Sequence, residues 1–137
     1  MVDELTSLYL DAIRQHAADP VGFRQEIDAT HQHEEYNPLC GDRILLQLRI
    51  GSGRIEAAAF DGEACAICLA SASLLCENTP GQTVEQLRSQ HQNLCEALEK
   101  HDAILRLEAL SPLLGVRPYP SRIRCATLPW AAASKAL

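Results

Sequence analysis

Two alternating apolar runs around a glycine-containing turn constrain the fold of this chain more than any other feature. Residues 43–50 are apolar at every second position, and residues 54–60 repeat the pattern after Gly51-Ser52-Gly53. A period of two is that of a half-buried strand, and a short turn with glycine joins antiparallel neighbours. We therefore expect a β-hairpin with a three-residue turn. Its inward positions are Ile44, Leu46, Leu48 and Ile50 in the first strand, and Ile55, Ala57 and Ala59 in the second.

A thiol and a carboxylate stand two residues apart just before this hairpin. They are Cys40 and Asp42 in the stretch 37–42, Asn-Pro-Leu-Cys-Gly-Asp, whose proline and glycine favour a turn. Cys65 follows the second strand, and antiparallel strands return the chain to the end where it began, so Cys40 and Cys65 should be neighbours. Thiolate beside carboxylate suits a borderline cation such as zinc. From Cys40 and Asp42 alone, a buried cysteine beside a turn-forming aspartate is an equal alternative.

Helical patterns surround the hairpin. Residues 3–18 carry an apolar stripe at helical spacing, and a polar stretch then leads to an edge strand near residues 26–36. Residues 65–77 and 83–99 also indicate helices, the second opened by the capping box Thr83-Val84-Glu85-Gln86. The stripe of the first helix consists of Leu5, Leu8, Tyr9, Ala12 and Ile13. The order of these elements predicts an α+β fold, with a small, mostly antiparallel sheet packed against helices.

Prolines indicate the helix boundaries in the C-terminal third of the chain. Residues 105–114 indicate a short helix interrupted by Pro112, and a turn follows. Proline is tolerated in the first turn of a helix but not in its interior. Pro129 therefore places the start of the last helix between Cys125 and Leu128, which would put Cys125, like Cys65, at a helix N-terminus.

Composition excludes several classes of function. The 137 residues include 12 basic and 18 acidic ones, giving a net charge of -6, so nucleic acid is not an expected partner. No apolar run approaches the roughly 20 residues that cross a bilayer, and the acidic start, Met1-Val2-Asp3-Glu4, does not resemble a signal peptide. We expect a single cytoplasmic domain over residues 1–137. In that compartment the six cysteines serve as ligands, nucleophiles or core residues.

Cys65 and Cys68 form a CxxC pair, which permits a second interpretation of the site. A cysteine at a helix N-terminus has a lowered pKa, and a dithiol there can exchange disulphides. No βαβ pattern surrounds the pair, however, and Ala66 and Ile67 between the cysteines are uninformative. A zinc-stabilised redox or binding protein built on this CxxC is therefore an alternative that the sequence leaves open.

Three stretches in register resemble the ligand motifs of the U-type iron–sulphur cluster assembly family, which includes SufU, IscU and the N-terminal domain of NifU. The stretches are residues 37–42, 62–73 and 122–130, and the resemblance covers roughly residues 5–135. Within the family the chain is more similar to the SufU branch. Arg124 stands where the scaffold branch has histidine before its third cysteine, and the segment between Cys65 and Cys125 is long, as in SufU.

The resemblance implies an α+β fold and a zinc site formed by Cys40, Asp42, Cys65 and Cys125, with Arg43, Arg122 and Arg124 offsetting its negative charge. It implies a zinc-dependent sulphurtransferase activity, in which Cys40 accepts persulphide sulphur from a SufS-type cysteine desulphurase. Four ligands of this kind also suit a [2Fe–2S] cluster. A scaffold that assembles and transfers such a cluster is therefore the alternative function.

Overall fold

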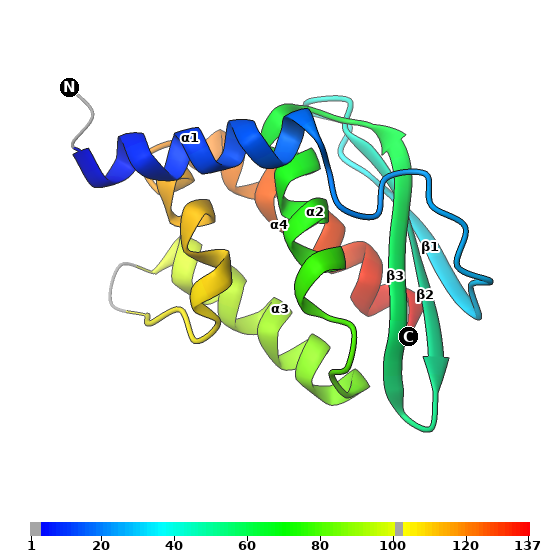
Figure 1. Ribbon diagram of the computed structural model, residues 1–137. Helices are drawn as coiled ribbons and strands as arrows, with labels where there is room; N and C mark the ends of the chain where they lie inside the picture. The colour runs from blue at the N-terminus through cyan, green and yellow to red at the C-terminus, as the bar shows by residue number, and fades with distance from the viewer. Residues whose placement is uncertain (1–3, 101–102) are drawn as a thin grey trace.

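The structure, a computed structural model, describes residues 4–100 and 103–137. Asp3, the expected first residue of the first helix, lies outside this range. In chain order the described elements are α1 (Glu4–Ala18), β1 (His31–Tyr36), β2 (Arg43–Gly51), β3 (Arg54–Glu63), α2 (Ala66–Asn78), α3 (Val84–Glu99), the 3₁₀ helix η1 (Glu108–Val116) and α4 (Pro120–Ala136). The predicted α+β fold is confirmed (Figure 1).

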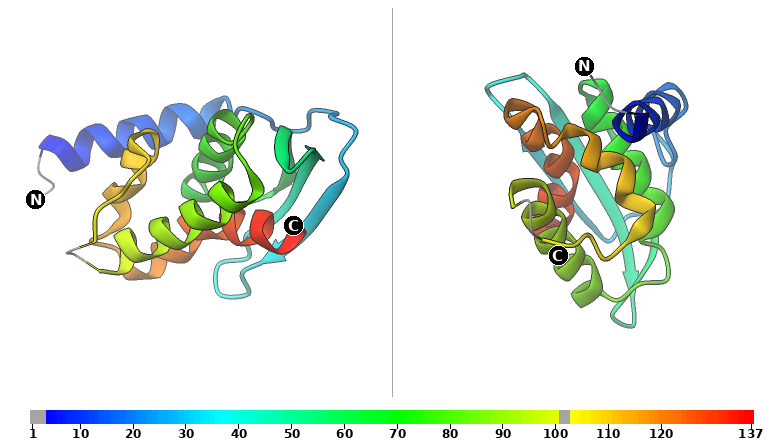
Figure 2. Two further views of the ribbon diagram at one scale, coloured as in Figure 1. Left: turned by 90° about the horizontal axis from the view of Figure 1, so that it is seen from below. Right: turned by 90° about the vertical axis from the view of Figure 1, so that its left-hand side faces the viewer.

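The three strands form one antiparallel sheet in the order β1-β2-β3. The sheet lies at one side of the molecule, and α2 and α4 pack against it while α1, α3 and η1 lie further out (Figures 1 and 2). Ile44, Leu46 and Leu48 of the central strand are buried beneath these helices, as their alternation predicts. The expected edge strand is present, but it is confined to the residues that pair with β2.

The hairpin is present, but its turn and the inward face of β3 differ from the prediction. Gly51 pairs with Arg54, which leaves a two-residue turn whose residues both have positive φ, a geometry that follows the twist of the strands. A bulge between Arg49 and Ile50 then shifts the register. As a result Ala58 and Phe60 join Ile55 on the inward face. The expected face of Ile55, Ala57 and Ala59 is therefore wrong beyond its first residue.

Helix α1 occupies the expected residues, and the C-terminal half of its predicted stripe faces inward while the N-terminal half does not. Ile13 is buried, whereas Leu5 and Leu8 are 57% and 60% exposed. The helix extends past the sheet and packs against α2 and η1, so only its C-terminal half lies over the core (Figure 1). Helix α1 also contacts α2 through a side-chain hydrogen bond, in which His16 Nδ1 and Ser73 Oγ are 2.9 Å apart.

The last helix begins at Pro120, five residues earlier than the predicted range. Proline 120 occupies the first turn, where it is favoured, and Pro129 lies inside the helix, where its ring leaves the Cys125 carbonyl without its usual donor. Packing outweighs this local cost, because Trp130, Ala132 and Ala133 are buried. Cys125 therefore lies in the second turn of α4, and its predicted place at a helix N-terminus is wrong.

The other predicted helices are confirmed. Cys65 is the N-cap residue of α2. Thr83 and Gln86 form the expected capping box of α3. The short helix around Pro112 is a 3₁₀ helix that runs on to Val116. No helix among residues 4–100 and 103–137 combines the length and apolar character needed to cross a membrane.

Gly62 is required where β3 approaches β2 beside the cysteines. Its φ is +147°, and a Cβ there would lie 2.0 Å from the Arg43 carbonyl oxygen. Because both the backbone angle and the space exclude a side chain, Gly62→Ala should destabilise the fold by about 3 kcal/mol. Gly53→Ala is the matched control, with φ +73° and nothing near the added carbon. It should cost only about 1 kcal/mol. Urea unfolding of both variants measures this, and equal losses would contradict the steric argument.

Candidate metal centre

The loop between β1 and β2 presents Cys40 at the surface. Asn37 is buried, its side-chain oxygen accepts from the Leu39 N–H at 3.1 Å, and its carbonyl accepts from the Gly41 N–H at 2.8 Å. Gly41 has the positive φ that its position in the turn predicted, +78°. The loop closes with an Asn37 N–H bond to the Asp42 carbonyl at 2.8 Å. These bonds fix the ends of the loop and leave Cys40 exposed at its tip.

Asp42 joins this loop to α2. Its side chain is 2% exposed. Oδ1 accepts from the Cys65 N–H at 2.8 Å, and Oδ2 lies 3.5 Å from Cys65 Sγ. Burial by itself raises the pKa of Asp42, but hydrogen bonds from the Cys40 thiol, from the Cys65 N–H and from the other two thiols outweigh burial and lower the pKa. One carboxylate oxygen therefore orients the side chain, while the other faces the thiols as an anion.

Cys125 reaches the same point from α4. Its Sγ lies 3.9 Å from Cys40 Sγ, and the ligand atoms of Cys40, Asp42 and Cys125 all lie within 4.8 Å of one another. Burial and a hydrogen bond to Asp42 raise the pKa of the Cys125 thiol. Cys65 contacts Asp42 but is not part of this group, so its predicted closeness to Cys40 is only indirect. The loop, the start of α2 and the second turn of α4 thus meet at one place.

The separations of these atoms fit a small tetrahedral ion. Two thiolates on one zinc, each at about 2.3 Å, stand about 3.8 Å apart, and a thiolate and a carboxylate oxygen about 3.5 Å apart. The distance between Cys40 Sγ and Cys125 Sγ is 3.9 Å, and that between Cys65 Sγ and Asp42 Oδ2 is 3.5 Å. The donor set that comes together, the sulphurs of Cys40 and Cys125 and an oxygen of Asp42, also suits a borderline cation. Cys65, the fourth predicted ligand, is not part of that group and reaches it through Asp42 Oδ2. The chemistry and spacing of the group are those of a metal centre.

The three arginines predicted to support the site have different surroundings. Hydrogen bonding to Cys125, together with the nearby negative charges, raises the pKa of the Arg122 guanidinium. Arg43 extends the other way, with Nη1 3.9 Å from Glu34 Oε2 of the edge strand. Arg124 is exposed, and within the described part of the chain its guanidinium has no hydrogen bond or ion pair. Of the three, Arg122 is the arginine that interacts with the charge of the cluster.

The second cysteine of the CxxC is not accessible. Cys68 is fully buried, and desolvation together with the charges of Asp42 and the neighbouring thiols raises its pKa far above the ordinary value. Cys76 is buried too, and burial raises its pKa to about 12. Dithiol exchange needs an accessible thiolate. The burial of Cys68 therefore argues against the redox interpretation.

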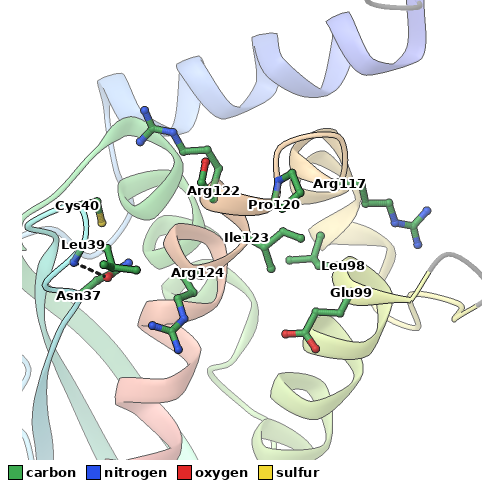
Figure 3. A pocket seen from close by; sticks show the side chains of 11 residues that line it. Asn37, Leu39, Cys40, Leu98, Glu99, Arg117, Pro120, Arg122, Ile123 and Arg124 are labelled. Carbon is green, nitrogen blue, oxygen red and sulfur yellow. Dashed lines mark hydrogen bonds between the residues drawn. The ribbon is translucent and has the colours of Figure 1, made fainter.

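A cavity of about 880 Å³ opens beside Cys40 and was not predicted from the sequence (Figure 3). It lies between the Cys40 loop, the end of α3 and the start of α4. Its apolar residues come from elements distant in sequence, and a periodic pattern cannot bring them together. The proline that opens α4 at Pro120 was the available signal, because it starts the helix early enough to form one wall.

Relatives of this chain are proteins of iron–sulphur cluster assembly. A family profile described as the NifU-like N-terminal domain matches residues 8–136. The zinc-dependent sulfurtransferase SufU of Bacillus subtilis is 32% identical, over 96% of this chain and 90% of its own length. The iron–sulfur cluster assembly scaffold protein IscU of Thermotoga maritima is 34% identical, over 95% and 92%. In fold the chain matches a NifU-like protein (N-terminal) of Brucella abortus with a TM-score of 0.86, at 21% identity and over 98% and 94%.

The exposure of the thiols predicts their order of reaction. Once metal has been stripped from the folded protein, iodoacetamide should modify Cys40 about a hundredfold faster than Cys68 or Cys76, because only Cys40 is exposed. Mass spectrometry of timed digests gives the three rates. Labelling in urea is the control and should make the rates similar. Comparable rates in the folded protein would contradict the described burial.

Proposed function

The chain belongs to the family of the NifU-like N-terminal domain, and from this membership we propose that it is a zinc-dependent sulphurtransferase of iron–sulphur cluster assembly. In this proposal Cys40 accepts persulphide sulphur from a SufS-type cysteine desulphurase. The observation that carries the proposal is the exposure of Cys40 at the edge of a cluster whose other members are buried or half-buried. A partner protein can reach that one thiol without opening the fold.

We assign the metal to Cys40, Asp42, Cys65 and Cys125. Zinc, when bound, holds its cysteine ligands as thiolates at neutral pH. Cys65 is held by the N-cap position of α2, and Cys125 by the interior of α4. Cys40 sits on a loop tip instead. It can therefore leave the cluster and return with less disruption than either of its fellow thiols.

The transfer step is a thiol exchange at sulphur. The Cys40 thiolate attacks the outer sulphur of the partner's persulphide, the partner's S–S bond breaks, and the partner leaves as a thiolate. Cys40 then carries the persulphide, and no oxidant or reductant is consumed. Asp42 Oδ1 stays bonded to the Cys65 N–H throughout, so the carboxylate keeps the neighbouring ligands in place while Cys40 is away.

A cluster scaffold is the second candidate function. It is favoured by the resemblance to scaffold proteins such as IscU of Thermotoga maritima. Three thiolates and a carboxylate also suffice to hold a [2Fe–2S] cluster as cargo. Arg124, which replaces the histidine expected of the scaffold branch, favours sulphur transfer.

Metal content separates the two candidates and tests the contribution of the ion to stability. Protein purified without oxygen should contain one zinc per chain and no visible absorption; iron, sulphide and a brown colour would favour the scaffold. Chelation should lower the melting temperature by about 10 °C. An ion present at a hundred times its dissociation constant contributes about 2.7 kcal/mol, and each kcal/mol shifts the midpoint by about 2–8 °C. An unchanged melting curve after verified removal of the ion would contradict the assigned ligands.

Cys40→Ser tests the acceptor. It should abolish persulphide formation with cysteine and the cognate desulphurase, because a hydroxyl is not a nucleophile towards sulphur at neutral pH, while weak zinc binding through the other ligands remains. Cys68→Ser is the matched control and should keep full acceptance and one zinc, since Cys68 is buried. Mass spectrometry of the peptide containing Cys40 locates the added sulphur. A persulphide on Cys65 or Cys125, with Cys40 unmodified, would overturn the assignment.

A further inference from the structure

We propose that the cavity beside Cys40 binds a small thiol bearing carboxylate groups, and that Cys40 passes its sulphur to this thiol. The inference rests on the proposed function, since it needs a persulphide on Cys40. It adds a second, diffusible acceptor and a recognition site for it. Arg124 is the residue we assign to the carboxylate.

The cavity has the dimensions of a small-molecule site. Its volume is about 880 Å³. Pockets for small ligands occupy roughly 300–1,000 Å³ and combine apolar walls with a few polar groups. Leu98 and Ile123 point towards one another inside it, between the Cys40 loop and the end of α3 (Figure 3). Leu39 adds a third apolar surface that is 84% exposed. A ligand with a short aliphatic body would cover these groups.

The charge of the lining selects an anion. Arg117, Arg122 and Arg124 line the cavity, and Glu99 is the one carboxylate among the described residues that line it. Two of the guanidinium groups are engaged already. Arg117 donates to the carbonyls of Ala97 at 2.7 Å and Ala103 at 3.3 Å. The guanidinium of Arg122 interacts with the charge of Cys125 and its neighbours, which raises its pKa.

Arg124 is the available cation. It is exposed, and its guanidinium forms no hydrogen bond or ion pair with any residue in 4–100 or 103–137. Arg124 also lines a smaller neighbouring cavity, together with Asn37 at the start of the Cys40 loop. Arg124 therefore lies between the two cavities. A guanidinium matches a carboxylate with two parallel hydrogen bonds. Arg124 can therefore anchor an acid group of a ligand that occupies the cavity.

The thiol of such a ligand meets Cys40 at the cavity wall. Its thiolate attacks the outer sulphur of the Cys40 persulphide, the S–S bond breaks, and Cys40 leaves as a thiolate. The product is a small persulphide anion. One sulphur atom moves, and no electron donor or acceptor is required. Cys40 is then free to return to Asp42 and Cys125, whose ligand atoms lie within 4.8 Å of it.

Binding is measured first, with the metal-loaded protein and a probe that cannot react. S-methylglutathione, titrated calorimetrically, should bind about tenfold more weakly to Arg124→Gln, because one charge-assisted pair is lost. Arg88→Gln is the matched control, since Arg88 is exposed on α3 and lines none of the cavities near the cysteines. It should leave binding unchanged. Absence of binding, or equal binding by wild type and Arg124→Gln, would overturn the proposal.

Transfer is measured next, with Cys40 loaded with persulphide and its loading verified by mass spectrometry. Glutathione should remove the sulphur about tenfold faster than glutathione diethyl ester, which keeps the thiol but lacks free carboxylates. Arg124→Gln should erase that difference. If glutathione and its diethyl ester removed the sulphur from the wild-type protein at equal rates, the proposal would be overturned. It would also be overturned by an Arg124→Gln effect confined to binding of the desulphurase, which would make the cavity a protein-docking surface. Failure of Cys40 to load would count against the proposed function instead, and the binding experiment would still test the cavity.

Discussion

The hydrogen bond from the Cys65 N–H to Asp42 Oδ1 organises the site. It ties the residue that precedes β2 to the residue that caps α2, across the open end of the hairpin. A buried carboxylate is costly unless it is hydrogen-bonded, so this bond compensates the burial of Asp42. The same bond leaves Oδ2 directed at the thiols. A fold constraint and a ligand position are thus supplied by one side chain.

The convergence at this point could be predicted because it follows from local pattern. Alternation over residues 43–60 defines the hairpin, and the hairpin returns Cys65 to the region of Cys40. The capping box at Thr83 and the N-cap at Cys65 are likewise short-range signals, and both are present. In each case the residues that determine the geometry are close together in the chain.

The predictions that were wrong depended on distant packing. The start of α4 was placed by a rule about Pro129, yet the buried surface around Trp130 outweighs the cost of that proline. The inward face of β3 was predicted from strict alternation. The bulge at Arg49 and Ile50 shifts the strand by one residue, so that other side chains of β3 face inward. Leu5 and Leu8 fit a helical stripe but lie where α1 extends beyond the core. Local periodicity does not show where along its length a helix stops packing against the core.

The earlier start of α4 changes how Cys125 and the two neighbouring arginines are positioned at the site. A cysteine in the second turn of a helix is bonded through its N–H to the preceding turn, and Cys125 is also fully buried, so it is held more firmly than the N-terminal position would have made it. The start of α4 then carries Arg122 near the cluster, and Arg124 two residues later, at the beginning of the second turn, lines a neighbouring hollow. Two arginines two residues apart on a helix point in different directions, because each residue advances by about 100°. One guanidinium then offsets the charge of the ligands, and the other remains free for a charge that arrives from outside.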